Sequence, residues 1–267
     1  MTGLLSYEFM QNALFAAILA SIACGLIGPF IVARRMVFIS GGLSHTAFGG
    51  LGIAYWMGIR PIYGATVFVL AAAFFLASLE ENKLSQNDLF IGILWSVGVA
   101  IGIVFVHLTP GYAPDLLSFL FGNILTVPRT DVAAMLVIVL IVVITVAIFY
   151  KGFVAIALDE EFALARRLPV RGLKTGLTVL AALTIVALIQ VVGILLVIAL
   201  LTIPVAIASE LSMNFRKIIA LSIFFGIAIC LLGLSISYSL EFPSGASIIL
   251  TGGALLLIVK GMKGIAK

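Results

Sequence analysis

Residues 131–150 read DVAAMLVIVLIVVITVAIFY, a continuous apolar run in which only the first side chain is charged. An α-helix needs about 20 such residues to cross the hydrocarbon core of a lipid bilayer. The apolar residues follow one another without the alternation that marks a membrane β-barrel strand, so the run favours a helix. This stretch predicts an all-α protein of the polytopic membrane class.

The whole chain has the composition of such a protein. Of its 267 residues, 63% are hydrophobic and 10% are charged, whereas soluble domains carry about 25% charged residues. Residues 190–193 separate the sixth and seventh apolar runs only weakly, so we predict eight or nine transmembrane helices. No linker divides the chain, and we expect a single transmembrane domain over residues 1–267. The candidate spans are 13–33, 37–57, 62–79, 89–108, 131–150, 173–189, 192–209, 217–238 and 244–260.

The basic residues predict how these spans are oriented. Of the 15 Lys and Arg residues, all but Arg60 and Arg129 fall in loops on the same side of the membrane. Cytoplasmic loops are the ones enriched in Lys and Arg. The C-terminus is therefore expected in the cytoplasm, and nine spans place the N-terminus outside. Because this topology accounts for the net charge of +4, we expect no nucleic-acid partner.

His45 lies inside the second apolar run, next to Ser44. A titratable side chain at membrane depth is costly unless it faces protein or a water-filled path, so it is a candidate functional residue. Residues four apart share one helix face, which aligns Gly41, His45 and Gly49. Such a face suits close helix packing, and a neutral imidazole also suits a transition-metal ion. The residues alone leave both readings open.

Several short motifs occur in a fixed order along the chain. With this ordered set the chain resembles the permease subunit of zinc- and manganese-type ABC importers, the ABC-3 family, from about residue 10 to residue 260. The motifs are Arg34-Arg35-Met36, Leu43-Ser44-His45, Phe121-Gly122-Asn123-Ile124-Leu125, a proline-centred apolar helix over 195–208, and Pro243-Ser244-Gly245-Ala246.

The resemblance implies a type II ABC importer-like bundle, working as a homodimer in the plasma (inner) membrane of a prokaryote. It implies two ABC ATPase subunits and an extracytoplasmic metal-binding protein as partners. The chain would be a transport subunit and not an enzyme, with ATP bound on the partner ATPase and no cofactor on this chain. In agreement, the sequence contains no Gly-x-x-x-x-Gly-Lys-Ser/Thr phosphate loop.

The resemblance also implies that His45 contacts a divalent metal ion in transit, with Ser44 as a candidate second ligand. Members of the family commonly carry an aspartate four residues before this histidine, whereas this chain has Gly41 there. Hard cations such as manganese prefer oxygen ligands, while imidazole suits zinc. The departure at Gly41 therefore favours zinc as the cargo over manganese or iron.

Residues 156–170 form the longest cytoplasmic loop and contain a short predicted helix that Pro169 terminates. Asp159 suits the N-cap, with acids in the first turn and bases in the last, as the helix dipole prefers. The resemblance implies that this segment is a coupling helix, with Phe162 as an apolar anchor in a groove of the ATPase. The residues assigned to the contact are Asp159, Glu160, Glu161, Phe162, Arg166 and Arg167.

Two other functions stay open at this point. A related permease for metal chelates or a cobalamin-like cofactor would need a larger cavity. An ion-driven secondary carrier would show inverted repeats and several intramembrane acids, and no Asp or Glu lies clearly at mid-membrane in this sequence.

We assign no specific function to two further features of the sequence. His107, at the outer end of the fourth span, is expected to be a solvated interfacial histidine. Residues 112–125 are apolar but too short to cross, which predicts an interfacial or re-entrant helix.

Overall fold

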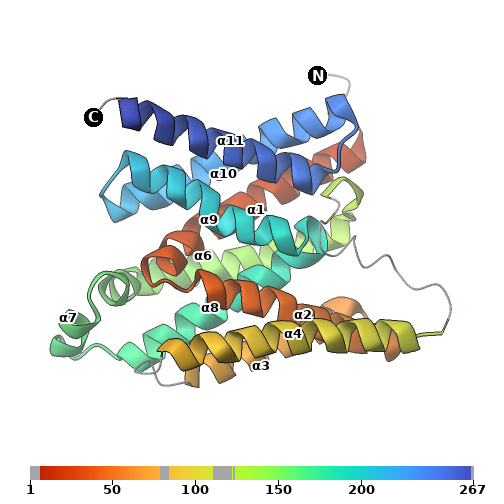
Figure 1. The fold of residues 1–267 in the computed structure, drawn as a ribbon, viewed down its shortest axis with the longest axis horizontal. Coiled ribbons are helices and arrows are strands. Elements are labelled where there is room, and N and C mark those ends of the chain that lie inside the picture. The colour runs from red at the N-terminus through yellow and green to blue at the C-terminus, as the bar shows by residue number, and fades with distance from the viewer. Residues whose placement is uncertain (1–6, 79–83, 111–121, 123, 266–267) are drawn as a thin grey trace. The chain divides into compact units, whose positions relative to one another are not determined.

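A computed structural model describes residues 7–78, 84–110, 122 and 124–265, and its regular structure within these ranges is helical (Figure 1). Nine helices of the described part are long and apolar enough to cross a membrane. The all-α prediction is confirmed, and the predicted count of eight or nine resolves to nine. They are α1 (Glu8–Ala33), α2 (Val37–Trp56), α3 (Pro61–Ser78), α4 (Leu84–Leu108), α6 (Arg129–Leu158), α8 (Val170–Val192), α9 (Ile194–Leu211), α10 (Phe215–Leu240) and α11 (Ser244–Ile265).

A single residue, Gly193, separates the sixth and seventh of these helices. Its backbone has a φ of 79° and a ψ of 163°, a conformation that glycine reaches without the steric penalty of a side chain. Gly122 lies directly against this break, because a Cβ atom on Gly122 would overlap the backbone of Val192 and Gly193. The glycine of the Phe121–Leu125 motif therefore leaves room for the boundary between α8 and α9.

The chain divides into two compact units, which are described separately. The first comprises residues 1–32, 117–148 and 187–267. Within it α9, α10 and α11 pack against one another, as Figure 1 shows. A Cβ atom on Gly233 of α10 would lie 2.5 Å from Cα of Ile248, so the backbones of α10 and α11 approach closely at this glycine.

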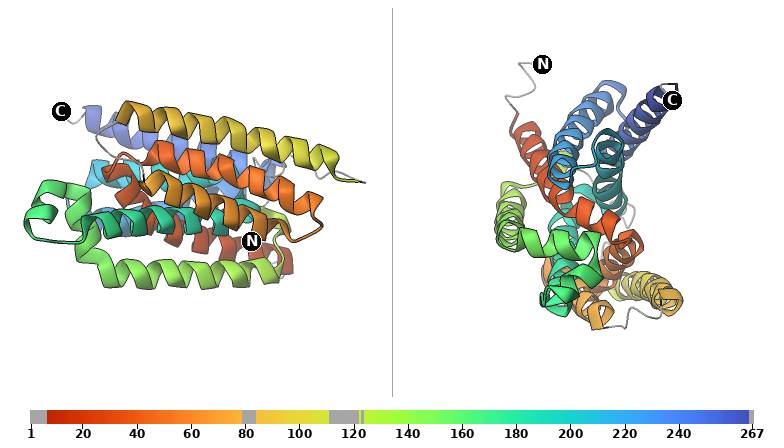
Figure 2. Two further views of the ribbon diagram at one scale, coloured as in Figure 1. Left: turned by 90° about the horizontal axis from the view of Figure 1, so that it is seen from below. Right: turned by 90° about the vertical axis from the view of Figure 1, so that its left-hand side faces the viewer.

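The second unit comprises residues 33–116 and 149–186. Its central helix is α2, which packs against both α3 and α4, and the two views of Figure 2 show these three helices side by side. Glycines make this possible: a Cβ atom on Gly49 would lie 2.9 Å from the carbonyl oxygen of Gly98, and one on Gly50 would overlap Gly64. Small residues permit such close contacts between helices in a membrane.

Several predicted boundaries were wrong by a few residues. Helix α6 continues to Leu158, so residues 156–158 are helical and do not belong to a loop. Helix α8 begins at Val170, three residues before the predicted start of that span. Of the predicted interfacial segment 112–125, residues 112–121 and 123 lie outside the described residues, and Ile124–Thr126 form a 3-10 turn, η2.

Replacing Gly50 by Ala should destabilise the packing of α2 on α3, because the added methyl group would meet the backbone of Gly64. Overpacking of this kind costs about 1–3 kcal/mol. Thermal unfolding in detergent measures the effect. The matched control is Gly92→Ala in α4, where the added Cβ atom meets open space and helix propensity improves by up to about 1 kcal/mol. Equal unfolding temperatures for the two variants would contradict the packing argument.

Candidate functional site

His45 is buried in α2, with 8% of its surface exposed. Its imidazole stacks on the indole of Trp95 from α4, with ring centroids 4.1 Å apart and an angle of 17° between the planes. Its Nδ1 atom is buried and has no hydrogen-bond partner in the described part of the chain. A buried polar atom without a partner is uncommon and calls for a specific explanation, such as an ion or a water. The imidazole therefore offers an uncommitted nitrogen at a helix interface.

Trp95 also covers Gly41, one turn before His45 on the same helix face. A Cβ atom on Gly41 would lie 3.1 Å from Cζ3 of the indole, so a larger side chain at this position requires Trp95 to move. The indole thus fills the space beside His45 that a side chain at position 41 would enter. Sequence reasoning missed Trp95, although its spacing of three residues from Gly98 places it on the helix face that packs against α2.

Ser44 is fully buried, but its hydroxyl group is directed at its own helix. Its Oγ atom donates a hydrogen bond to the carbonyl oxygen of Ser40, 2.8 Å away. Within the described residues, no group of three or more His, Cys, Asp or Glu side chains could hold a metal ion. The described residues therefore supply no cluster of metal ligands, and the assignment of Ser44 as a ligand stays a prediction.

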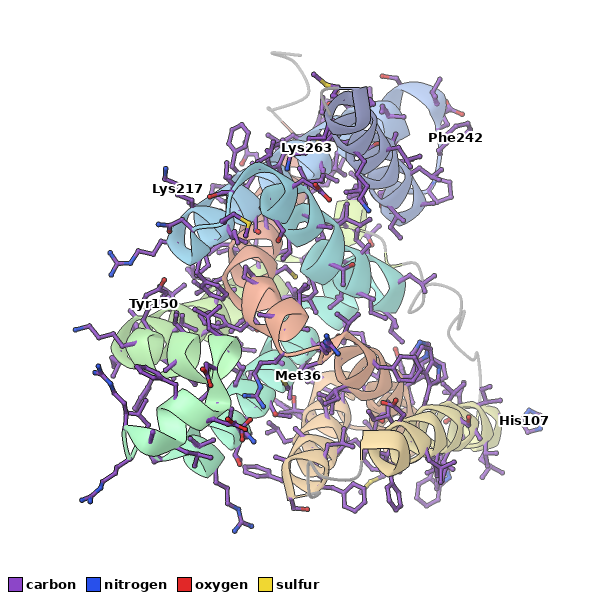
Figure 3. All side chains as sticks on the ribbon, turned by 60° about the vertical axis from the view of Figure 1, so that its left-hand side comes forward. Met36, His107, Tyr150, Lys217, Phe242 and Lys263 are labelled. Carbon is purple, nitrogen blue, oxygen red and sulfur yellow. The ribbon has the colours of Figure 1, made fainter. Side chains whose placement is uncertain are left out.

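His107 lies at the far end of α4 and is exposed. The twelve residues from Trp95 to His107 extend about 18 Å along a helix. Figure 3 shows the His107 side chain pointing away from the helices. The structure therefore does not bring His107 to the imidazole of His45, in line with its reading as an interfacial histidine.

The predicted short helix is present as α7 (Glu160–Ala165). Its N-cap prediction is confirmed, because Oδ1 of Asp159 accepts a hydrogen bond from the backbone N–H of Phe162 at 2.9 Å. The C-terminal prediction was wrong: no base lies in the last turn. Arg167, with a φ of 56°, and Leu168 instead close the helix through backbone hydrogen bonds to Leu164 and Ala163, the arrangement of a Schellman motif.

The side chains of α7 fall into two groups. Phe162 is 51% exposed, and the guanidinium group of Arg166 lies 5.0 Å from the centre of its ring. Leu164, Glu161 and Arg167 are exposed as well. Glu160 instead faces the chain itself and forms ion pairs with other elements. The structure therefore exposes apolar side chains on α7 together with charges of both signs at its two ends, while Glu160 contacts other elements of the chain.

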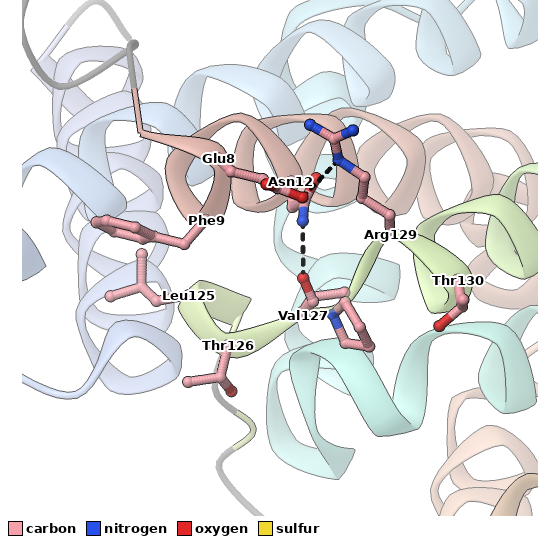
Figure 4. A pocket seen from close by; sticks show the side chains of 9 residues that line it. Glu8, Phe9, Asn12, Leu125, Thr126, Val127, Arg129 and Thr130 are labelled. Carbon is pink, nitrogen blue, oxygen red and sulfur yellow. Dashed lines mark hydrogen bonds and ion pairs between the residues drawn. The ribbon is translucent and has the colours of Figure 1, made fainter.

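A pocket of about 450 Å³ lies at the start of α1, beside the η2–α6 connection (Figure 4). Nε of Arg129 pairs with Glu8 at 2.6 Å. Nδ2 of Asn12 donates a hydrogen bond to the carbonyl oxygen of Val127 at 3.1 Å. These contacts tie the first turns of α1 to the segment that leads into α6. The predicted topology places this pocket on the outer side of the membrane.

Residues 6–263 match a family described as the ABC 3 transport family. A curated relative, the manganese transport system membrane protein MntC of Listeria monocytogenes, is 35% identical over 256 residues, which cover 96% of this chain and 91% of the relative. Both matches extend over nearly the whole chain.

Two solved structures are similar to the chain. One comes from PsaBC of Streptococcus pneumoniae in complex with Fab, at 34% identity and a TM-score of 0.87, and the match covers 97% of this chain and 93% of that one. The other is an inward-facing conformation of a putative metal-chelate type ABC transporter, at 16% identity and a TM-score of 0.76, covering 95% and 86% of the two chains. At that identity the second likeness shows the fold alone.

Replacing Trp95 by Ala should expose His45, because the indole covers one face of the imidazole. The chain has two histidines, so the change is made in a His107→Gln background that leaves His45 as the only imidazole. We expect diethyl pyrocarbonate to modify His45 several-fold faster, as followed by ultraviolet absorbance. The control is Trp56→Ala, which removes the other tryptophan from its contact with Phe105. Equal rates in both variants would show that Trp95 does not cover His45.

Proposed function

The chain belongs to the ABC 3 transport family, as a membrane-spanning permease of an ABC metal importer, and we propose that it carries a divalent transition metal ion past His45, with zinc preferred. Its fold is that of the transmembrane subunit of a type II ABC importer. It is a multi-pass membrane protein and a transport subunit without catalytic activity of its own. ATP hydrolysis is assigned to a separate ATPase chain.

The unpaired Nδ1 atom of His45 is the observation that carries this proposal. The atom is buried and unpaired within the described residues, in the central helix of the second unit. Neutral imidazole is a common ligand for zinc, whereas manganese favours carboxylate oxygens. With Gly41 under the indole of Trp95, no carboxylate accompanies His45 on its helix face. The donor chemistry therefore supports zinc.

Manganese is the second candidate, and the relatives favour it. MntC of Listeria monocytogenes and ScaB of Streptococcus gordonii are both named for manganese transport, and they are 35% and 32% identical to this chain. Their names support the same transport class for this chain. The choice between the two metals depends on whether position 41 influences selectivity.

The remaining parts of the proposed importer are supported by the family membership of the chain, and for the ATPase contact also by the exposed surface of α7. The exposed surface of α7 suits a groove of an ATPase subunit, with Phe162 as the apolar anchor and the charged residues Asp159, Glu161, Arg166 and Arg167 around it. A second copy of the chain would complete the path, and an extracytoplasmic metal-binding protein would deliver the ion. A transit site must bind weakly enough to release its ion, which suits a site with few donors.

ATP-dependent metal uptake tests the proposal directly. Vesicles contain the chain, its ATPase and its binding protein, and radiolabelled zinc and manganese are offered separately. We expect zinc uptake that His45→Ala reduces by at least about tenfold, the effect of losing roughly one metal–ligand or charged hydrogen-bond interaction. His107→Gln is the matched control, because it removes the other histidine from an exposed helix end.

Uptake that survives His45→Ala would reduce His45 to a packing residue. Uptake of manganese in preference to zinc would show that the missing carboxylate does not decide the cargo. Transport of neither free ion would favour a chelate or cofactor as the substrate.

Reversing the charges of Arg166 and Arg167 to Glu should weaken the association of the ATPase while the permease stays folded, because both bases are exposed at the end of α7. The yield of ATPase that co-purifies with the permease measures the effect. The control reverses a second exposed basic pair at the start of α10, Arg216 and Lys217, of which Figure 3 labels Lys217. An undiminished ATPase yield in the α7 variant would rule out these bases as docking residues.

A further inference from the structure

Glu160 joins the short helix α7 to the connection between α1 and α2 and to the start of α8, all within the second unit. Its Oε2 atom lies 3.6 Å from a guanidinium nitrogen of Arg34, and its Oε1 atom pairs with Nζ of Lys174 in α8. The side chains of Glu160 and Arg34 are 33% and 11% exposed. Contacts that are this well shielded from solvent are screened less than surface ion pairs and are harder to break. Glu160 therefore differs from its exposed neighbour Glu161.

Arg34 occupies the short connection between α1 and α2. Besides its contact with Glu160, its guanidinium group donates a hydrogen bond to the carbonyl oxygen of Ile156 in α6, 3.0 Å away. Arg35 follows with a φ of 57°, Met36 is buried, and α2 starts at Val37. The connection is therefore compact, and Arg34 holds the first turn of α2 to the segment that carries α7.

The same helix carries His45. From Val37 to His45 is eight residues, or about 12 Å of continuous helix. A helix of this length moves as a rigid element, since each residue is fixed by a backbone hydrogen bond to the next turn. Any displacement of α7 that acts through Glu160 and Arg34 is therefore delivered to the imidazole and to its stacking contact with Trp95.

We propose that Glu160 is a positioning residue that transmits movement of α7 to α2, and that it does not dock the ATPase. This inference rests on the proposed function, because it requires an ATPase that moves α7. The exposed residues of α7 make the contact with the partner, and Glu160 passes its displacement through Arg34 to the helix that holds His45. Lys174 fixes the other oxygen of the carboxylate, which couples the start of α8 to the same movement.

Glu160→Gln tests this role, because it keeps the shape of the side chain and removes the charge that binds Arg34 and Lys174. The complete importer is reconstituted in vesicles, and three quantities are measured: co-purified ATPase, ATP hydrolysed, and zinc or manganese moved per ATP. We expect the first two to be retained and the third to fall about tenfold, because the variant weakens the charge-assisted contacts with both Arg34 and Lys174.

Glu210→Gln is the matched control. Glu210 has a side chain that is 34% exposed, nearly the same as Glu160, and it pairs with Lys263 at 3.4 Å. It lies in α9, away from α7 and α2 along the chain. Glu210→Gln should move as much metal per ATP as the wild type. If the loss of any paired carboxylate impaired transport in general, this variant would show the same loss.

The outcomes separate the two proposals. A wild-type chain that neither binds an ATPase nor shows ATP-dependent uptake overturns the proposed function itself. A working wild type, together with a Glu160→Gln variant that moves as much metal per ATP, overturns the transmission role alone. Loss of ATPase association in that variant would also overturn it, since it would make Glu160 a docking residue. If Glu160→Gln does not fold, Arg34→Lys is measured in the same way, because it keeps the charge but loses the planar two-sided contact.

Discussion

The close approach of α2 to its neighbours is the constraint on which the candidate site depends. Gly49 and Gly98 bring the backbones of α2 and α4 together, and Gly50 does the same against Gly64 of α3. In a membrane, helices gain little from the hydrophobic effect when they associate, so packing of small residues supplies much of the stabilisation. This packing fixes the distance between α2 and α4, and that distance places the indole of Trp95 on the imidazole of His45.

The second organising feature is that some residues hold α7 in place while others stay exposed. Its six residues are too few to bury a core, so the helix is held by its caps and by Glu160. Asp159 satisfies the N-terminus and the Schellman arrangement closes the C-terminus. With its ends and one carboxylate engaged in this way, the helix can present Phe162 and Leu164 to a partner without losing its own conformation.

Much of the fold could be predicted from the sequence, because hydropathy and segment length report directly on membrane spans. A count of eight or nine spans was accessible in this way, and the N-cap at Asp159 was accessible from its residue type ahead of an acidic first turn. The inward orientation of Glu160 was not, since its partners Arg34 and Lys174 come from distant parts of the chain. For position 41 the sequence shows only that a side chain is missing. That Trp95 fills the space beside Gly41 depends on how α2 and α4 pack, which composition does not report.

If His45 contacts the ion as proposed, the small number of protein donors affects the water around the ion. An ion held by one nitrogen retains most of its own hydration shell, since zinc takes four ligands in typical protein sites. The proposed route past His45 would then accommodate a partly hydrated ion, and protein groups would replace little of its hydration energy. The ion would then meet only a shallow energy minimum at His45, which suits rapid passage better than storage. The indole of Trp95 would then mainly limit the width of the route and the access of water to the imidazole.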